Sequence, residues 1–343
     1  MRAVVLTGHG GPEVLRVEER PDPAVGPGDV RIDVRAAGIN FADTLARVGL
    51  YPDAPKPPCV LGYEIAGEVE SFGEGVTDYK VGDRVVAGTR FGGQASLVTV
   101  PAGQVLRLPE RLSFEQGAAI PVNYSTAYCG LVVMGGVKEG ERALIHAAAG
   151  GVGTAAVQIA RMRGADVFGT ASAQKHEAVR SLGATHMIDY RSEDFEEEVK
   201  RITGGEGVDV IFDAQGPRSF RKSYRALRPG GRLIMYGLAE ASTGQGRSIP
   251  KLIESLARMP LATMPWWKSL QVMNENKGVF GLNMLAWWDT EGDIDRITGP
   301  LVGEIEAGEL EPVVAEAFPF DRAGDAHTFI AERRNIGKVV LVP

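Results

Sequence analysis

Cysteine is scarce in this 343-residue chain, which has only Cys59 and Cys129. Two thiols cannot form a disulfide framework, so a reducing, cytoplasmic compartment is the expected location. The chain also lacks an uninterrupted apolar run of about 18 residues, the length that a membrane-spanning helix needs. The first residues enter a strand pattern directly, and we therefore expect no signal peptide.

An excess of positive charge is absent as well. Lys and Arg number 37 against 44 Asp and Glu, which gives a formal net charge of −7, and no long basic run occurs. This balance argues against a general nucleic-acid-binding protein. The hydrophobic content of 44% and the charged content of 24% are ordinary for a folded globular protein. The length favours about two domains.

Glycine, in contrast, is abundant, and one glycine-rich segment carries the most informative motif. The segment 146–154 (HAAAGGVGT) lies between an apolar strand that ends at Ile145 and an apolar helix expected at 152–162, and a second strand is expected from residue 166. This βαβ unit has Ala148-x-Gly150-x-x-Gly153 at its first turn, a dinucleotide fingerprint with alanine at the first glycine position. Gly150 lets the backbone approach a pyrophosphate, Gly153 lets helix and strand pack closely, and the helix N-terminus offers free N–H groups.

The remaining pattern divides the chain into a β-rich part and an alternating part. Up to about residue 110, period-two alternation predicts strands at 30–35, 64–71, 83–87 and 95–100, with a short helix at 40–47. Ser113 is the expected N-cap of a helical stretch that passes Pro121 and ends near residue 134. From about residue 140, strands are expected at 186–188, 208–213 and 232–236, and helices at 173–182, 193–202 and 218–227. Repeated βα units predict a parallel sheet with ligands beyond the carboxyl ends of its strands.

Several segments together resemble the medium-chain dehydrogenase/reductase superfamily, and within it the zinc-free quinone oxidoreductases. They are 36–43 (AAGINFAD), 81–85 (VGDRV), the glycine-rich segment and 334–338 (RNIGK), while 280–284 (FGLNM) is most similar to the vesicle amine transport protein homologue branch. The resemblance implies an α/β fold with two domains. A Rossmann domain with a doubly wound parallel sheet, residues 125–284, would bind NADP(H). A β-rich GroES-like catalytic domain would comprise 1–124 and 285–343, and a homodimer would form through the cofactor domains.

The residues after the second strand of the βαβ unit indicate which nicotinamide cofactor to expect. An NAD site usually has an acidic residue there, about 20 residues after the first glycine. This chain has Ser172 and Lys175 instead, which favours a 2′-phosphate and therefore NADP(H), although Lys175 could also be a solvated residue of a first helical turn. The resemblance and the strand ends add further cofactor contacts, and Lys338 among them could equally be an end-of-strand surface charge. They are Asn40, Thr126, Ala149, Gly150, Gly151, Val152, Gly153, Tyr190, Gln215, Tyr236, Phe280, Gly281, Asn335 and Lys338.

The catalytic residues are inferred from the same resemblance. Zinc members of the superfamily have cysteine at the position of Asn40 and histidine at that of Tyr63, and the five histidines here form no ligand-spaced pair, so no metal is expected. Asn40 and Asp43 would face the nicotinamide and the substrate, with Tyr51 and Tyr63 nearby. Asn40 would donate an N–H and Tyr51 an O–H, whereas Asp43 would orient its neighbours. Asn40 could also be a helix N-cap, and Tyr51 a packing aromatic.

Together these features predict an NADPH-dependent reductase whose substrates are small molecules, namely quinones or other α,β-unsaturated carbonyls. Two alternatives stay open: an enoyl-thioester reductase, and a lipid- or partner-binding protein that retains its nucleotide site. The latter depends on the pairs Trp266-Trp267 and Trp287-Trp288, which either cap an apolar pocket or dimer edge, or form a hydrophobic patch for membrane lipid.

Overall fold

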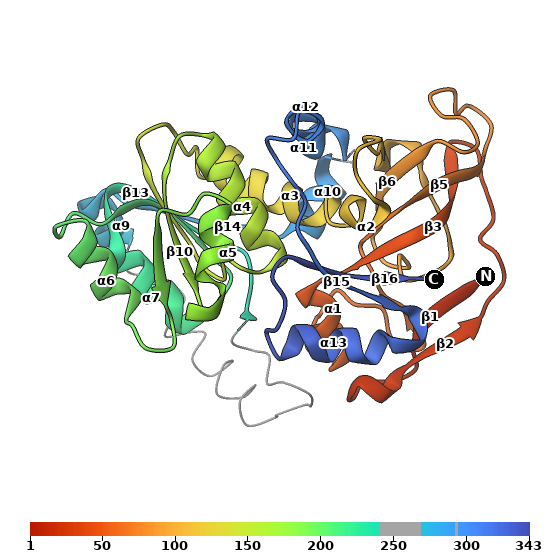
Figure 1. Cartoon of the computed structure of the whole chain (residues 1–343), viewed down its shortest axis with the longest axis horizontal. Helices are drawn as coiled ribbons and strands as arrows, with labels where there is room; N and C mark the ends of the chain where they lie inside the picture. Colours follow the sequence, from red (N-terminus) through yellow and green to blue (C-terminus); the bar gives the residue numbers. More distant parts are fainter. Residues whose placement is uncertain (240–268, 292–293) are drawn as a thin grey trace. The chain divides into compact units, whose positions relative to one another are not determined.

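The structure, a computed structural model, describes residues 1–239, 269–291 and 294–343, and these form two compact units (Figure 1). The β-rich unit contains residues 1–125 and the described part of 284–343. The Rossmann unit contains residues 126–239 and 269–283.

The Rossmann unit is built around a parallel sheet. In the described residues its six strands follow the order β11-β10-β9-β12-β13-β14. Their bounds are β9 (Arg142–Ile145), β10 (Asp166–Ala171), β11 (His186–Asp189), β12 (Val208–Asp213), β13 (Leu227–Met235) and β14 (Gly278–Gly281). From β9 the chain builds β10 and β11 on one side, and then crosses to β12 on the other. This is the predicted parallel sheet, and its order reverses beside β9, where such sheets bind ligands.

Helices alternate with these strands along the chain. They are α4 (Gly151–Met162), α5 (His176–Ser181), α6 (Phe195–Ile202), α7 (Pro217–Ala226) and α9 (Ser269–Glu275). The buried cluster of this unit includes Leu144, Phe168, Ile211 and Leu233, so the apolar strand runs in the sequence are confirmed as core. The helix expected over 173–182 is divided, because a 3₁₀ turn at Ala173–Lys175 precedes α5.

The β-rich unit contains a larger, mainly antiparallel sheet. In the described residues it has seven strands in the order β15-β16-β3-β5-β6-β8, with β7 also paired to β3, beside a smaller sheet of order β2-β1-β4. Their bounds are β1 (Arg2–Leu6), β2 (Leu15–Glu19), β3 (Asp29–Ile39), β4 (Cys59–Val60), β5 (Glu64–Phe72), β6 (Arg84–Gly88), β7 (Leu97–Pro101), β8 (Val105–Arg107), β15 (Val314–Pro319) and β16 (Lys338–Val342). The alternation along β3 is confirmed, since Val30, Ile32 and Val34 are buried and the residues between them are partly exposed.

The helices of the β-rich unit are short. They are α1 (Phe41–Arg47), α2 (Phe114–Gly117), α10 (Met284–Glu291), α11 (Asp295–Thr298), α12 (Val302–Glu306) and α13 (Ala323–Ala331). The predicted N-cap at Ser113 is confirmed, because its hydroxyl accepts the Gln116 N–H at 3.2 Å. Next, α3 (Pro121–Tyr128) spans the boundary between the units and continues as a π-helical segment, Cys129–Met134.

The end of the chain returns to the centre of the larger sheet. Strand β16 pairs antiparallel with β3, with Val339 opposite Ile39 and Val340 opposite Gly38. This register brings Lys338 beside Asn40, the residue that precedes α1. Lys338 and Asn40 are therefore neighbours although they are 298 positions apart in the sequence.

Candidate active site

A buried ion pair forms the centre of the polar cluster in the β-rich unit. The ammonium of Lys338 donates to the Glu64 carboxylate and, at 2.7 Å, to the side-chain oxygen of Asn40. Lys338 is 2% exposed and Glu64 is fully buried. The surface-charge alternative for Lys338 is therefore wrong, because the side chain is enclosed and paired.

Glu64 is a member of this cluster that sequence reasoning missed. Beyond the ion pair, its carboxylate accepts the Asn40 amide N–H at 3.0 Å and the Val122 backbone N–H at 2.7 Å. Gly38 makes room for it, since a Cβ there would lie 2.7 Å from Glu64 Cγ. The available signal was an acidic residue directly before the apolar residues 65–67 (IAG), where an unpaired buried charge would be costly.

The Asn40 side chain is held at both ends. Its oxygen accepts from Lys338, and one of its two amide protons goes to Glu64, so the orientation of the amide is determined by its partners. The amide has one further proton besides the one that Glu64 accepts. Because the ammonium polarises the amide through its oxygen, the N–H becomes a stronger donor than an isolated amide.

The Asp43 carboxylate accepts hydrogen bonds from the backbone. Its two oxygens accept the Asn40 N–H at 2.7 Å and the Gly62 N–H at 3.1 Å, so the carboxylate fixes the start of α1 and the turn before β5. Burial raises the pKa of Asp43 to about 7, although both N–H bonds and the charge of Lys338 oppose this shift. These contacts agree with the expectation that Asp43 orients its neighbours, and they place Asn40 at the N-terminus of α1, as its alternative role predicts.

Tyr51 and Tyr63 lie together in an aromatic group. Their rings meet edge to face with centroids 6.4 Å apart, and Phe91 packs 5.1 Å from Tyr63. Burial raises the pKa of both hydroxyls. The Tyr63 hydroxyl is buried and makes no hydrogen bond of ordinary geometry within the described residues, whereas Tyr51 is partly exposed. The two predicted tyrosines are thus neighbours, and Tyr51 is the more exposed of them.

Two further predicted residues have supporting positions. Asn335 lies in the turn before β16, and its amide donates to the Gly337 carbonyl oxygen at 2.8 Å, directly before Lys338. Thr126 is buried in α3, at the first position of the Rossmann unit. Asn335 therefore helps to shape the turn that leads to the buried lysine.

The glycine-rich bend of the Rossmann unit has the geometry that the motif predicts. Gly150 is the extended residue before α4, and the N–H groups of 151–153 form the first turn, which has no acceptor within its own helix. A Cβ at Gly153 would lie 2.1 Å from the Ala147 carbonyl oxygen, so only glycine permits this approach of α4 to the backbone of the bend. The bend, including Ala149 and Val152, can therefore receive a pyrophosphate.

The other predicted cofactor residues of this unit follow the carboxyl ends of its strands. Tyr236, after β13, stacks on Phe212 with ring centroids 3.9 Å apart, and the Gln215 N–H, after β12, donates to Asp213 at 2.8 Å. The structure thus gathers these residues at one edge of the sheet. They are Ser172 and Lys175 after β10, Tyr190 after β11, Gln215 after β12, Tyr236 after β13, and Phe280 with Gly281 at the end of β14.

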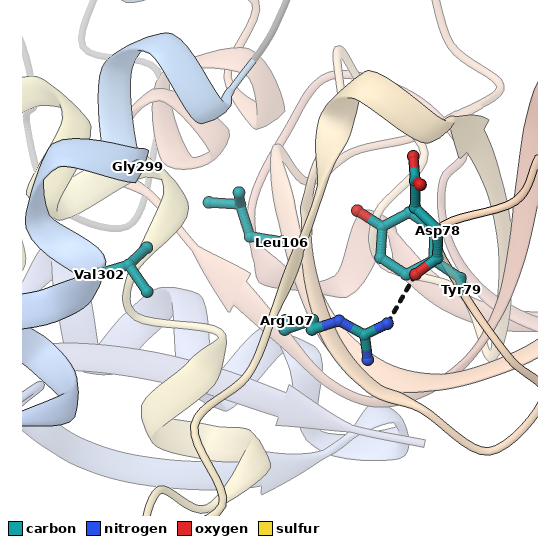
Figure 2. A pocket seen from close by; sticks show the side chains of 6 residues that line it. All are labelled: Asp78, Tyr79, Leu106, Arg107, Gly299 and Val302. Carbon is teal, nitrogen blue, oxygen red and sulfur yellow. Dashed lines mark hydrogen bonds between the residues drawn. The ribbon is translucent and has the colours of Figure 1, made fainter.

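The β-rich unit has two surface hollows. Figure 2 shows one of about 310 Å³, lined by Asp78, Tyr79, Leu106, Arg107, Gly299 and Val302. Its polar groups bond to one another, since the Arg107 guanidinium donates to the Asp78 carbonyl oxygen at 2.6 Å and to Asp83 at 2.8 Å. The other, about 390 Å³, lies between β15 and α13 and includes Phe318, Arg322 and Phe329. Neither contains a predicted site residue.

The described residues contain no group of three or more His, Cys, Asp and Glu placed to hold a metal ion. None of the described helices is long and apolar enough to cross a bilayer. Trp287 and Trp288 lie on α10, and Trp288 packs near Gly88, where a Cβ would be 3.4 Å from its ring. Trp266-Trp267 and the apolar stretch 252–259 lie outside the described residues.

Comparison with known proteins places these features in context. Residues 26–110 match the alcohol dehydrogenase GroES-like domain, and residues 151–259 match the zinc-binding dehydrogenase family. The synaptic vesicle membrane protein VAT-1 homolog of Rattus norvegicus is 40% identical over 352 residues, which cover 100% of this chain and 84% of that protein. The structure of Escherichia coli quinone oxidoreductase complexed with NADPH has a TM-score of 0.85 at 32% identity, with 100% of both chains covered. CurK enoyl reductase has a TM-score of 0.84 at 29% identity, with 99% of this chain and 98% of that chain covered.

Proposed function

The chain belongs to the medium-chain dehydrogenase/reductase superfamily of oxidoreductases, and on this premise we propose that it is a zinc-free, NADPH-dependent reductase of quinones or other α,β-unsaturated carbonyls. The observation that carries the proposal is the Lys338–Glu64–Asn40 cluster. It presents an oriented and polarised N–H donor in a unit whose relatives include a quinone oxidoreductase. The alternative enoyl-thioester substrate would use the same donor, since its carbonyl is conjugated too.

The residues of the Rossmann unit fit an NADP(H) molecule. The close approach at Gly153 and the N–H groups of the first turn of α4, which have no acceptor within their own helix, suit a pyrophosphate. Ser172 and Lys175, at the end of β10, offer a hydroxyl and a cation to a 2′-phosphate. The bound cofactor would supply the hydride. The residues after the other strand ends would line the rest of the dinucleotide.

The polar cluster of the β-rich unit would act on the substrate carbonyl. Asn40 would donate its second amide proton, and Tyr51 its hydroxyl, to the oxygen on which negative charge develops. Asp43 would hold the start of α1 so that Asn40 keeps its position. Lys338 is too enclosed to be a surface group, and it would stabilise the developing charge through the Asn40 amide.

The donor set of this cluster does not suit a catalytic zinc ion. A catalytic zinc needs about three protein ligands with available lone pairs. Here the Glu64 oxygens accept from an ammonium, an amide and a backbone N–H, and both Asp43 oxygens accept backbone N–H groups. The Lys338 ammonium also provides a positive charge among these groups, and it would repel a second cation.

The test combines binding with turnover. NADPH and NADH affinities are measured by calorimetry for wild type, for Lys175→Ala and for the exposed control Lys138→Ala. Lys175→Ala should weaken NADPH much more than NADH, and Lys138→Ala should change neither. Stopped-flow loss of NADPH absorbance is then followed with quinones, enones and enoyl-thioesters. Absence of turnover above the uncatalysed rate with all three classes would refute the proposed activity, and turnover of enoyl-thioesters alone would select that alternative.

The second candidate function is lipid or partner binding with a retained nucleotide. It is favoured by the name of the rat relative, a synaptic vesicle membrane protein. Flotation of the wild-type chain with vesicles of neutral and of anionic lipid tests the lipid-binding form, and a chain that stays with the soluble fraction in both would refute that form. We also propose a cytoplasmic homodimer formed through the Rossmann units, and the molar mass from light scattering would test whether the chain is a dimer.

A further inference from the structure

A series of buried polar side chains lies beneath the glycine-rich bend. His146, directly after β9, is 2% exposed, and its ring nitrogens lie 3.2 Å from Thr170 Oγ1 and 3.1 Å from Ser223 Oγ. Thr170 belongs to β10 and Ser223 to α7. The imidazole therefore joins the strand before the bend to a neighbouring strand and a helix, and the proposed reaction makes no use of it.

The far end of this series is a carboxylate. Asp213, the last residue of β12, is fully buried. It accepts the hydroxyls of Ser219 at 2.6 Å and Ser223 at 2.7 Å, and the Gln215 N–H at 2.8 Å. An ionised carboxylate only accepts hydrogen bonds, so the Ser223 proton must point at Asp213.

The position of that proton fixes the others in turn. Ser223 has one proton and donates it to Asp213, so toward His146 its oxygen can only accept, and ring atom Nε2 must carry a proton. Burial lowers the pKa of His146 and keeps the ring neutral, against the opposing charge of Asp213 at 3.8 Å. Atom Nδ1 is then an acceptor, and the Thr170 hydroxyl donates a hydrogen bond to it. The Thr170 oxygen is left to accept the Ala147 backbone N–H, which lies 3.3 Å away.

The series ends at Ala147, which belongs to the glycine-rich bend. Ala147 has φ of 52°, in the left-handed region that is unfavourable for an L residue. Its carbonyl oxygen accepts the Gly150 N–H at 2.8 Å, and this same oxygen faces the close approach at Gly153. The hydrogen bond from its N–H to Thr170 therefore holds the backbone unit on which the shape of the bend depends.

We propose that His146, held as the Nε2–H tautomer, is a positioning residue for the nucleotide-binding bend, oriented by Asp213 through Ser223 and acting through Thr170 on Ala147. The inference rests on the proposed function in one respect, that the bend binds a dinucleotide. His146 makes no contact with reacting atoms in this scheme. Its effect would appear in cofactor affinity rather than in the chemical step.

The tautomer is measured on the cofactor-free wild-type chain. Long-range ¹H–¹⁵N correlation spectra of ¹⁵N-histidine-labelled protein distinguish the five histidines, and His146→Gln identifies the signals of His146. Near neutral pH we expect a protonated Nε2 and an unprotonated Nδ1. Ser223→Ala should change this pattern, whereas Ser219→Ala, which removes a different bond to the same Asp213 oxygen, should preserve it. A ring protonated at Nδ1 or at both nitrogens, or a pattern unmoved by Ser223→Ala, overturns the proposal.

The effect on the bend is measured with a matched pair of variants. Thr170→Val keeps the shape of the side chain and removes its hydroxyl, and Thr170→Ser keeps the hydroxyl. We expect Thr170→Val to bind NADPH about tenfold more weakly, equivalent to about 1.4 kcal/mol, with Thr170→Ser near wild type. Both should bind adenosine 2′-monophosphate like wild type, since this ligand has no pyrophosphate.

The outcomes separate the two hypotheses. Equal NADPH affinities for the two variants would overturn the positioning role while the proposed function stands. If wild type bound no NADPH, the proposed function and the positioning role would both fail. The tautomer measurement would then still decide whether the hydrogen bonds run from Ala147 to Asp213 as described.

Discussion

Lys338→Met is the sharpest single test of the polar cluster, because it leaves Glu64 buried without its cation. Methionine matches the length of lysine and keeps most of its packing. Glu64 would retain only the Asn40 amide at 3.0 Å and the Val122 N–H at 2.7 Å as donors. Breaking a buried pair in this way is far more costly than removing an exposed one.

The size of the loss follows from two limits. At an ion-pair separation of about 3 Å and an effective dielectric constant of about 20, the lost attraction is about 5.5 kcal/mol. Glu64 can instead take up a proton, and protonating an ordinary glutamic acid costs about 3.7 kcal/mol at pH 7. The less costly of the two routes determines the result, so we expect the free energy of unfolding of the variant to fall by about 3–4 kcal/mol at pH 7. At pH 5 the same proton costs about 1 kcal/mol, and the loss should shrink accordingly.

Urea unfolding of wild type and variant at both pH values measures this loss, and amide exchange of β16 peptides identifies the transition that belongs to the β-rich unit. The double variant Glu64→Gln/Lys338→Met should be more stable than Lys338→Met, because neither charge is then left alone. Lys80→Met removes an exposed lysine of the same unit and should stay within about 0.5 kcal/mol of wild type. A loss below about 1 kcal/mol at pH 7, or one that is equal at pH 5 and pH 7, would refute the reasoning.

Three further predictions concern the remaining buried groups. Gly153→Ala should melt well below Gly150→Ala without cofactor, because a Cβ would lie 2.1 Å from the Ala147 oxygen at 153 and 3.3 Å from it at 150; equal melting temperatures would contradict this. Burial raises the pKa of Asp43 to about 7, so the stability contributed by its protonated form is complete below about pH 4 and is lost as the pH rises through 7. Urea unfolding of Asp43→Asn from pH 5 to 8 should lack this decline, and parallel curves for variant and wild type would count against it. Both ring nitrogens of His327 are buried without a partner in the described residues, and burial lowers its pKa to about 3. The stability contributed by its neutral form is present above about pH 6.5 and is lost toward pH 3. As the pH falls from 7 to 5, the free energy of unfolding of His327→Leu should therefore rise relative to that of wild type, and a relative fall would contradict the prediction.

Features that depend on near neighbours in the sequence were predictable. The helix N-cap at Ser113 needs only a partner three residues later, and the contact from Asp43 to the Asn40 N–H has the same spacing. The alternation of strands and helices after residue 140 follows from apolar periodicity, and it led to the parallel sheet. By contrast, β14 was not predicted, because four residues with a glycine at each end carry little pattern.

Features that depend on distant pairing were not predictable. Lys338 meets Glu64 across 274 positions and Asn40 across 298. A lysine at the start of a strand is equally compatible with a surface charge, and only the pairing of β16 with β3 buries it. His146 was noted as the first residue of the bend motif, yet its partners come from 24 and 77 positions away. The motif located the site, but it could not show which hydrogen bonds hold it.

The two polar clusters solve the same physical problem. An amide and an imidazole each have two orientations that fit one cavity almost equally, and the two orientations exchange a donor for an acceptor. Asn40 is bonded at both its oxygen and its nitrogen, and His146 at both ring nitrogens, so each retains a single orientation. In each case the direction is set by a fully buried carboxylate, Glu64 or Asp213, which accepts the hydrogen bonds of its neighbours. Replacing either carboxylate by its amide introduces a donor where only acceptors stood, and this change should disturb the orientation of Asn40 or His146 more than the removal of a neighbouring hydroxyl would.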